Sequence, residues 1–313
     1  MAAQGQLIYA SDYNVVQSVV QNVMGTGSGT QGYGQTVTSS QIVGNPNIST
    51  TQWANLRNDL LKSYYHLNSP GSLTIPTAPT TSTKITYADY AKYLAISTAV
   101  NSHKLDSPPS GQASNVTFST GTRTTNWNSI IYHTVVMSFA SQNAARFYFN
   151  AGGYITFQAS LVGYPGYNGI GSQDASYTKN QDWNMLLNNM GTTTFNYGST
   201  TNNGNGTGQT IASTTGYYQL TTSPTLIYSK TTQTTAYTPN QYDIYASVDA
   251  TGAILTFSIR FEDLATSSGH NPTYAIDEDV EGTLTSLVKG YYASGSNVQV
   301  TAPSINNANP TIA

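Results

Sequence analysis

The segment that decides the fold is residues 242–261, with the sequence YDIYASVDATGAILTFSIRF. Apolar residues occupy every second position on both sides of a turn at 249–252. A period of two is typical of β-strands with one buried face, and a short turn between two such runs predicts a hairpin. We therefore expect an antiparallel sheet whose core face carries Tyr242, Ile244, Ala246, Val248, Leu255, Phe257, Ile259 and Phe261.

Similar alternation continues on both sides of this hairpin. Phe147 and Phe149 precede Gly152 and Gly153, and residues 155–161 alternate after them, which predicts a second hairpin. Residues 182–190 resemble a short helix, and 163–171 and 196–208 are typical of exposed loops. Further strands are expected at 130–139, 191–197, 217–222, 226–231, 280–291 and 297–301, enough for two packed antiparallel sheets.

Toward the N-terminus the apolar period changes to that of a helix. Helices are expected at 11–24, at about 50–67, and from Thr86 until Pro108 stops the last one. The stretch 106–113, rich in Pro, Ser and Gly, separates the two patterns. The sequence therefore predicts an α+β protein, with a small helical N-terminal docking region at 1–110 and a mainly antiparallel β-sandwich domain at 111–313.

The composition indicates a subunit of an assembly. Charged residues make up 8% of the 313 residues, against roughly 25% in ordinary soluble domains. A surface of hydroxyl, amide and phenol groups suits permanent contact with other subunits, because few charges keep neighbouring molecules apart.

Composition also excludes several classes of function. The net charge of −3, with Lys and Arg scattered singly, gives no basic surface for nucleic acid or anionic lipid. There is no apolar run long enough for a membrane helix and no export signal at the start, so we expect a chain that is neither membrane-bound nor exported. The absence of cysteine excludes disulfides and thiolate metal sites.

Motifs for catalysis or cofactor binding are weak. Gly27, Gly29 and Gly32 spell G-x-G-x-x-G, but this motif follows a predicted helix instead of a strand, which favours a loop over a nucleotide site. The four histidines lie far apart, and the serines lack a G-x-S-x-G setting. We expect no enzyme activity, no cofactor and no metal. Calcium binding at the acidic turn 277–281 stays an alternative, because its carboxylates and backbone carbonyls offer the hard oxygen ligands that calcium prefers. The D-x-[DN]-x-[DN]-G spacing of known calcium loops is absent from this turn.

Two sets of side chains are candidates for contact with partners. Apolar stripes on the first two predicted helices are candidate docking residues: Val15, Val16, Val19, Val20, Val23, Trp53, Leu56 and Leu60. Tyrosines in pairs or loops are candidate partner-contact residues, because one ring of an adjacent pair on a strand must face outward; the alternative is that both rings pack locally. These are Tyr164, Tyr167, Tyr217, Tyr218, Tyr291 and Tyr292.

Several segments resemble a known group of proteins. Residues 23–35 (VMGTGSGTQGYGQ) and 53–59 (WANLRND) resemble the opening of virion structural proteins from tailed phages, notably T4-like cyanophages. Residues 145–153 (ARFYFNAGG) and 257–261 (FSIRF), with Trp183, Leu186, Leu187 and 190–192 between them, are similar to later parts of such proteins. The resemblance implies membership of a phage particle and brings no catalytic residues.

Together these observations predict a structural component of a tailed-phage virion, assembled in the host cytoplasm. A tail or neck appendage, a fibre or collar subunit, fits a helical docking region followed by a projecting β domain. The alternatives are a capsid decoration protein and a carbohydrate-binding receptor protein. The expected partners are copies of the chain itself and other virion proteins, with a host surface glycan as the partner under the receptor alternative.

Overall fold

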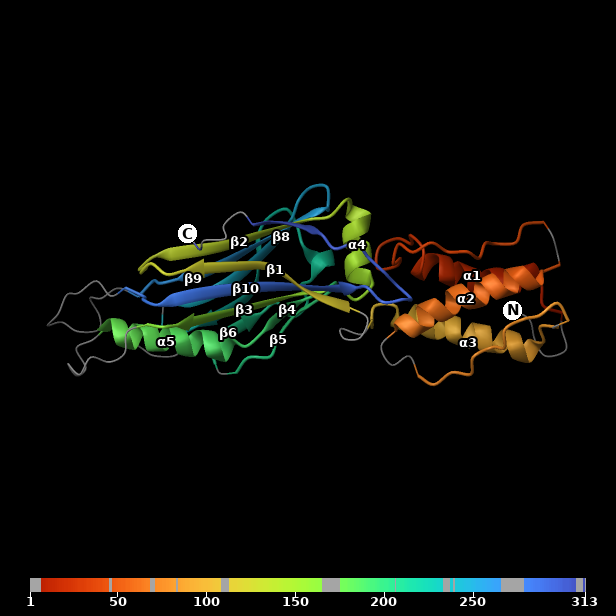
Figure 1. Cartoon of the computed structure of the whole chain (residues 1–313), viewed down its shortest axis with the longest axis horizontal. Coiled ribbons are helices and arrows are strands. Elements are labelled where there is room, and N and C mark those ends of the chain that lie inside the picture. Colours follow the sequence, from red (N-terminus) through yellow and green to blue (C-terminus); the bar gives the residue numbers. More distant parts are fainter. Residues whose placement is uncertain are drawn as a thin grey trace. The chain divides into compact units, whose positions relative to one another are not determined.

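The computed structural model confirms the α+β class, with a helical N-terminal region followed by mainly antiparallel sheets (Figure 1). It describes residues 7–44, 47–67, 71–82, 84–107, 113–164, 175–205, 207–232, 237–238, 240–265, 279–307 and 312.

The chain separates into two compact units, and the first draws on three parts of the sequence. We call Met1–Ser114, Gln142–Gly153 and Tyr291–Ala302 the helical unit. We call Asn115–Ser141, Tyr154–Gly290 and Pro303–Ala313 the sandwich unit. The helical unit therefore includes two segments from beyond the expected boundary at residue 110.

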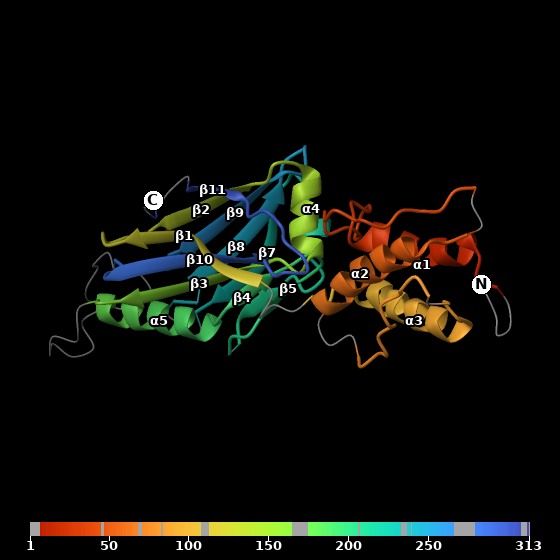
Figure 2. The same ribbon diagram turned by 45° about the vertical axis from the view of Figure 1, so that its right-hand side comes forward.

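The helical unit is built on helices that run in the same direction. These are α1 (Ala10–Val23), α2 (Thr50–His66) and α3 (Tyr87–His103), close to the predicted bounds. The connecting residues 24–44 and 71–82 return along the bundle before the next helix begins (Figures 1 and 2). As a result, α1, α2 and α3 all start at one end of the unit and finish at the other.

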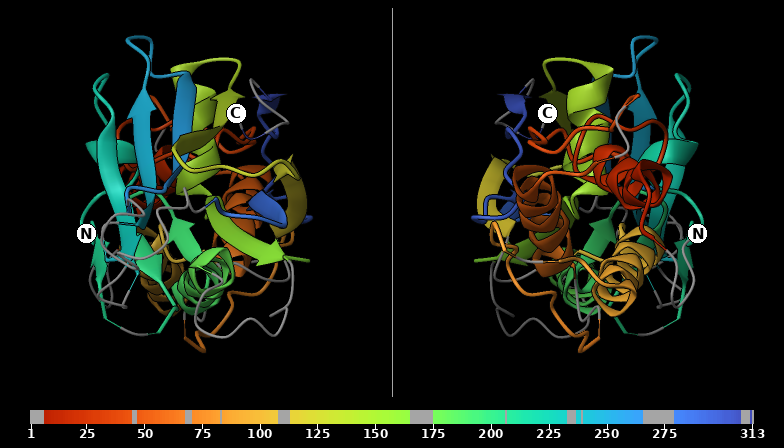
Figure 3. Two further views of the ribbon diagram at one scale, coloured as in Figure 1. Left: turned by 90° about the vertical axis from the view of Figure 1, so that its left-hand side faces the viewer. Right: turned by 90° about the vertical axis from the view of Figure 1, so that its right-hand side faces the viewer.

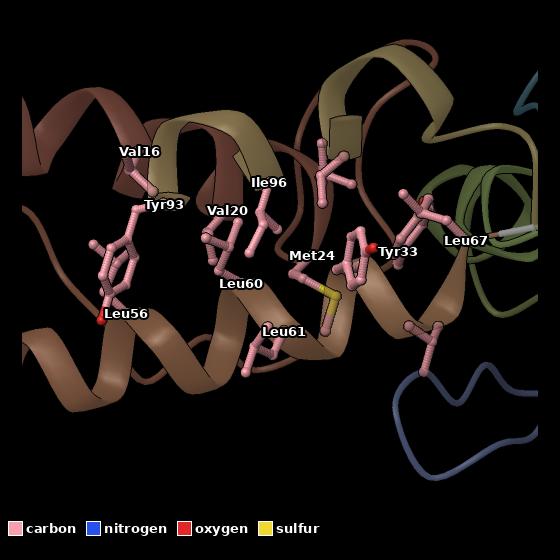
Figure 4. Packing of buried hydrophobic residues seen from close by; sticks show 14 of the residues in the cluster. Val16, Val20, Met24, Tyr33, Leu56, Leu60, Leu61, Leu67, Tyr93 and Ile96 are labelled. Atoms are coloured by element: carbon pink, nitrogen blue, oxygen red, sulfur yellow. The ribbon is translucent and has the colours of Figure 1, made fainter. Parts of the chain in front are cut away.

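The apolar stripes of these helices face one another. Val20 of α1, Leu60 of α2 and Ile96 of α3 have no exposed surface, and Figure 4 shows their side chains meeting between the helices. The Trp53 ring lies 5.3 Å from Tyr13 and 4.9 Å from Tyr93, measured between centroids. Burying each such side chain contributes roughly 2 kcal/mol, so packing supplies the stability that valine-rich helices lack in isolation.

A further helix, α4 (Gln142–Asn150), holds the glycine-rich loop that follows α1. The Arg146 guanidinium donates hydrogen bonds to the carbonyl oxygens of Thr26 (3.0 Å), Gly29 (2.8 Å) and Gln31 (3.1 Å). Nδ2 of Asn150, one helical turn later, donates to carbonyls of the same loop at 3.1–3.2 Å. Both side chains are buried, so the loop carbonyls are satisfied without water.

The direction of the carbonyl groups in this loop shows whether its glycine motif could bind phosphate. Its carbonyl oxygens converge on a cation, whereas a phosphate site requires converging N–H donors. Gly32 has a φ of 97°, and a Cβ there would lie 2.2 Å from the carbonyl oxygen of Thr26. The G-x-G-x-x-G spacing therefore serves a tight turn around Arg146, in agreement with the loop interpretation.

The helix α4 replaces a predicted strand. Alternation of Phe147 and Phe149 favoured a hairpin turning at 152–153, and that prediction is wrong. The buried residues are Ala145, Arg146, Tyr148, Phe149 and Asn150, and positions 145, 148 and 149 have the i, i+3, i+4 spacing of one helix face. Contacts with a loop more than a hundred residues earlier determine this segment, and Gly152, at a φ of 89°, follows the helix end.

The sandwich unit contains two sheets in the described residues. The first has the order β1-β10-β3-β4-β5 and the second β11-β2-β9-β8-β7-β6. The predicted hairpin at 242–261 is confirmed, with Val248 opposite Leu255 and Gln241 opposite Glu262. The strands are β1 (Ala113–Arg123), β2 (Ile130–Ser138), β3 (Tyr154–Val162), β4 (Thr193–Phe195), β5 (Thr200–Asn202), β6 (Gln209–Ile211), β7 (Thr225–Thr231), β8 (Gln241–Val248), β9 (Ile254–Glu262), β10 (Thr283–Ala293) and β11 (Ser304–Asn307).

Aromatic side chains fill the space between the sheets. Phe257 of β9 lies 5.1 Å from Phe157 of β3 and 5.4 Å from Phe195 of β4, between ring centroids. The helix α5 (Ala175–Met190) is longer than the predicted 182–190 and contributes the fully buried Trp183. These contacts join residues of both sheets and a helix in one core.

Three further segments differ from prediction. Residues 217–222 include a 3₁₀ turn, η2 (Tyr217–Gln219), because Tyr217 bonds through its N–H to Asn196 and through its hydroxyl to Gly252 instead of pairing in a sheet. Residues 297–301 make only a single bridge, between Gln299 and Ser294. The loop 196–208 contains β5, where Thr200 is fully buried.

The role of Arg146 predicts the effect of Arg146→Lys. A lysine ammonium is a single point and cannot serve three separated carbonyls, so we expect the helical unit to lose about 2 kcal/mol of unfolding free energy. Urea denaturation followed by far-ultraviolet circular dichroism measures this. Arg57→Lys is the control, because Arg57 donates one hydrogen bond, to Pro76 at 2.8 Å. Equal effects of the two substitutions would contradict the role of Arg146.

Candidate docking surface

The helix starts of the helical unit share one sequence pattern. Residues 8–13 (IYASDY), 48–53 (ISTTQW) and 85–90 (ITYADY) each place isoleucine just before the N-cap, Asp or Gln at the third helical position and an aromatic residue next. This internal repeat was missed from the sequence, although comparing the predicted helix starts would have found it. At all these starts the side chain of the third helical residue accepts a hydrogen bond from the N-cap N–H.

Reciprocal capping bonds hold the starts of α2 and α3. Ser49 accepts a hydrogen bond from the Gln52 N–H at 3.2 Å, and Gln52 Oε1 accepts one from the Ser49 N–H at 2.8 Å. Thr86 and Asp89 make the same exchange at 3.3 and 3.1 Å. Such boxes satisfy N–H groups that a helix start otherwise leaves free, so this end is ordered before any partner arrives.

The isoleucines complete each start as a hydrophobic staple. Ile8, Ile48 and Ile85 are partly buried and pack against the core of the unit. The aromatic residue five positions after each isoleucine, Tyr13, Trp53 or Tyr90, is buried. Because α1, α2 and α3 run in parallel, the isoleucines gather at one end of the bundle, the end that the right-hand view of Figure 3 faces.

A pocket of about 360 Å³ lies at this end of the bundle. Polar and apolar atoms contribute about equally to its accessible surface. Lys84 is the one charged residue among the described residues that line it: Leu7, Ile8, Asn47, Ile48, Thr50, Trp53, Pro79, Lys84 and Ile85. Large apolar side chains near the helix starts are exposed, with Leu7 at 74% and Val43 at 89%, together with Tyr9 and Tyr87. We call these four residues and the pocket the docking end.

The candidate docking residues from the sequence lie mostly elsewhere. Val16, Val20, Val23, Leu56 and Leu60 are buried in the core of the helical unit, so these side chains do not face a partner. Trp53 is also buried in this core, but it lines the pocket at the docking end. Val19 is partly buried against the same core, and only Val15 is exposed, at 43%. The physical reason is that the parallel helices bury their stripes against one another.

The candidate partner-contact tyrosines are distributed over the sandwich and helical units. Tyr217 is buried, its hydroxyl donates to the Gly252 carbonyl at 3.1 Å, and its ring lies 5.2 Å from that of Tyr218. This pair therefore packs locally, as the alternative predicted. Tyr164, Tyr218, Tyr291 and Tyr292 are partly buried, and Tyr167 lies outside the described residues.

The described residues contain no group of three or more His, Asp or Glu side chains placed to hold a metal ion. Asp277 and Glu278 of the acidic turn lie outside the described part of the chain. Glu281 lies within it, and its carboxylate accepts a hydrogen bond from Asn126 at 3.3 Å. Calcium binding at this turn stays untested.

One histidine has serine partners but no access to a substrate. Nε2 of His133 in β2 lies 2.6 Å from Ser119 Oγ in β1, and Nδ1 lies 2.8 Å from Ser286 Oγ in β10. All three residues are at most 2% exposed. Because His133 belongs to one sheet and both serines to the other, the ring joins the sheets instead of activating a nucleophile.

Burial of this imidazole predicts a pH dependence of stability. Loss of hydration lowers the pKa of His133 from 6.5 to about 4. Below pH 6.5 the His133 ring binds a proton in the unfolded chain but stays neutral in the folded protein. The unfolding free energy therefore falls by about 3 kcal/mol as the pH is lowered from 6.5 to about 4. In urea denaturation at several pH values, His133→Gln should reduce the dependence of unfolding free energy on pH, whereas His103→Gln, at an exposed site, should not change it. The same pH dependence in the unmodified protein and both variants would contradict the prediction.

Comparison of the chain with known protein families, with curated proteins and with solved structures finds no match. Among the described residues, none of the helices has both the length and the apolar character to cross a bilayer.

Proposed function

We propose that this protein is a structural component of a tailed-phage virion, a tail or neck appendage subunit with a projecting β domain. It attaches to other virion proteins through the docking end of its helical unit. The observation that carries this proposal is the cluster of exposed apolar side chains beside a pocket at the helix starts, in a chain with only 8% charged residues. Exposed apolar patches of this kind are typical of protein interaction sites.

The rigidity of the docking end supports its use as an attachment point. Its helix starts are capped and stapled, so little conformational entropy is lost when a partner covers them. At the opposite end of the bundle the glycine-rich loop is tied by Arg146 and Asn150. A preorganised apolar surface of this kind suits one permanent neighbour. Capsid decoration would use the same surface with a different neighbour.

The receptor alternative has one observation in its favour. On the outward-facing positions of the six-stranded sheet, the Arg260 guanidinium lies 4.1 Å from the ring centroid of Tyr245 and 5.6 Å from that of Tyr132. Aromatic rings beside a polar planar group are typical of sugar recognition. The guanidinium already covers a face of Tyr245, however, which reduces the ring surface open to a sugar.

The proposed attachment predicts a defect for Leu7→Glu combined with Tyr87→Glu. Two carboxylates at the docking end cannot be buried against an apolar partner, so incorporation of the variant into particles should fall at least about tenfold. Quantitative mass spectrometry of purified particles, from host cells that express a tagged variant, measures incorporation. Tyr65→Glu is the matched control, since Tyr65 is 50% exposed at the far end of α2.

Two results would count against the proposal. Wild-type incorporation of the double variant rejects the docking end as the attachment surface, and absence of the unmodified protein from particles rejects the virion role. For the receptor alternative, the purified protein is passed over immobilised host polysaccharide. We expect no retention, whereas retention that Tyr245→Ala abolishes would favour a carbohydrate-binding receptor protein instead.

A further inference from the structure

A buried ion pair lies under α5 in the sandwich unit. Nζ of Lys179 in α5 is 2.6 Å from Oδ2 of Asp263, which directly follows β9, and the two side chains are 2% and 0% exposed. Burying such a pair is costly in a protein interior and gives little net stability in return. Stability alone therefore does not explain why two of the few charged side chains of this chain are buried together.

The surroundings of the pair are apolar and aromatic. Trp183 has no exposed surface, and its ring centroid lies 4.8 Å from that of Trp127 and 6.5 Å from that of Phe261. Burial raises the pKa of Asp263 to about 6, although the side chains of Lys179, Asn240 and Trp183 act to lower it. A carboxyl group in this state can both accept and return a proton near neutral pH.

An asparagine side chain faces the same carboxylate. Asn240 is fully buried, and its Oδ1 accepts hydrogen bonds from the backbone N–H groups of Leu264 (2.8 Å) and Ala265 (2.7 Å). Two N–H donors on one carbonyl oxygen stabilise negative charge there, as in the oxyanion hole of acyl-transfer enzymes. Its Nδ2 lies beside Asp263 without a hydrogen bond of ordinary geometry among the described residues.

From this arrangement we infer that Lys179 and Asn240 become joined by an isopeptide bond, with Asp263 as the catalytic residue that carries the protons. An amine nucleophile, a polarised amide and a carboxyl group that contacts both lie in one water-excluding site. Burial favours the uncharged form of the Asp263 carboxyl group over its carboxylate. The site therefore contains each group that the reaction needs.

The reaction balances without any further reagent. Asp263 takes a proton from the Lys179 ammonium, and the free amine attacks Cγ of Asn240. The negative charge on Oδ1 is held by the Leu264 and Ala265 N–H groups. The C–Nδ2 bond then breaks as Nδ2 takes a proton and leaves as ammonia. The remaining proton stays on Asp263 until ammonia carries it to solvent as ammonium.

The bond would tie α5 to the residue that precedes β8. It closes a loop between positions 179 and 240, so the unfolded chain is restricted much as a disulfide restricts it. The chain has no cysteine with which to form a disulfide. A covalent cross-link made from the side chains already buried in the sandwich supplies the same constraint.

Mass spectrometry of the purified full chain tests the inference. Loss of ammonia lowers the intact mass by about 17 Da relative to the sequence. After trypsin digestion, the expected product is a branched pair that joins residues 147–230, uncleaved at Lys179, to residues 231–260. Lys179→Met and Asp263→Asn should abolish both signals. Lys230→Met is the matched control, because Lys230 is equally buried and donates to the Asn205 and Thr207 carbonyls.

Several results would overturn the inference. An unchanged mass in the unmodified protein rejects the bond, and a loss of about 18 Da, that of water, mapped to Lys179 and Asp263 rejects Asn240 as the acceptor. A loss of ammonia confined to one unbranched peptide would be an asparagine succinimide and equally contradicts it. If the Asp263 variant fails to fold, peptide mapping of the unmodified protein still decides the question. None of these results depends on whether the protein is found in a virion.

Discussion

The helical unit depends on one interaction, the contact between the Arg146 guanidinium and the carbonyl groups of the glycine-rich loop. Without it, a turn with several inward-pointing carbonyls would be buried unsatisfied, at a cost of several kcal/mol. The contact also explains why a segment from the middle of the chain belongs to the N-terminal unit. The tied loop closes the end of the bundle opposite the helix starts and leaves those starts as the apolar end of the unit.

Charged side chains are scarce in this chain, at 8% of its residues. In the helical unit, buried Arg146 donates hydrogen bonds to the carbonyl groups of the glycine-rich loop. In the sandwich unit, buried Lys179 and Asp263 form an ion pair beside the polarised amide of Asn240. The capping box of α2 and the serine hydroxyls beside His133 satisfy polar groups without a carboxylate or an amine. The surface is left with hydroxyl, amide and aromatic groups, which suit permanent contact between subunits more than free diffusion.

Local periodicity was enough to predict much of the fold. The first two helices and the hairpin at 242–261 follow from it, because each is long and its pattern is regular. The helix α4 could not be predicted this way, since the partners of Arg146 lie at residues 26–31. The docking end was missed because the stripes that looked available are core, and only the parallel direction of the helices brings their starts together. Lys179, Asn240 and Asp263 are likewise distant in sequence and meet only in the folded sandwich.

We propose that this chain is a permanent part of a particle, attached through the helix starts of its helical unit. A cryo-electron microscopy map of the intact virion, at a resolution that traces side chains, tests it most directly. We expect density for this chain with Leu7, Tyr9 and Tyr87 covered by a neighbouring virion protein. Density in which these side chains face solvent, or a complete particle that lacks the chain, would contradict it.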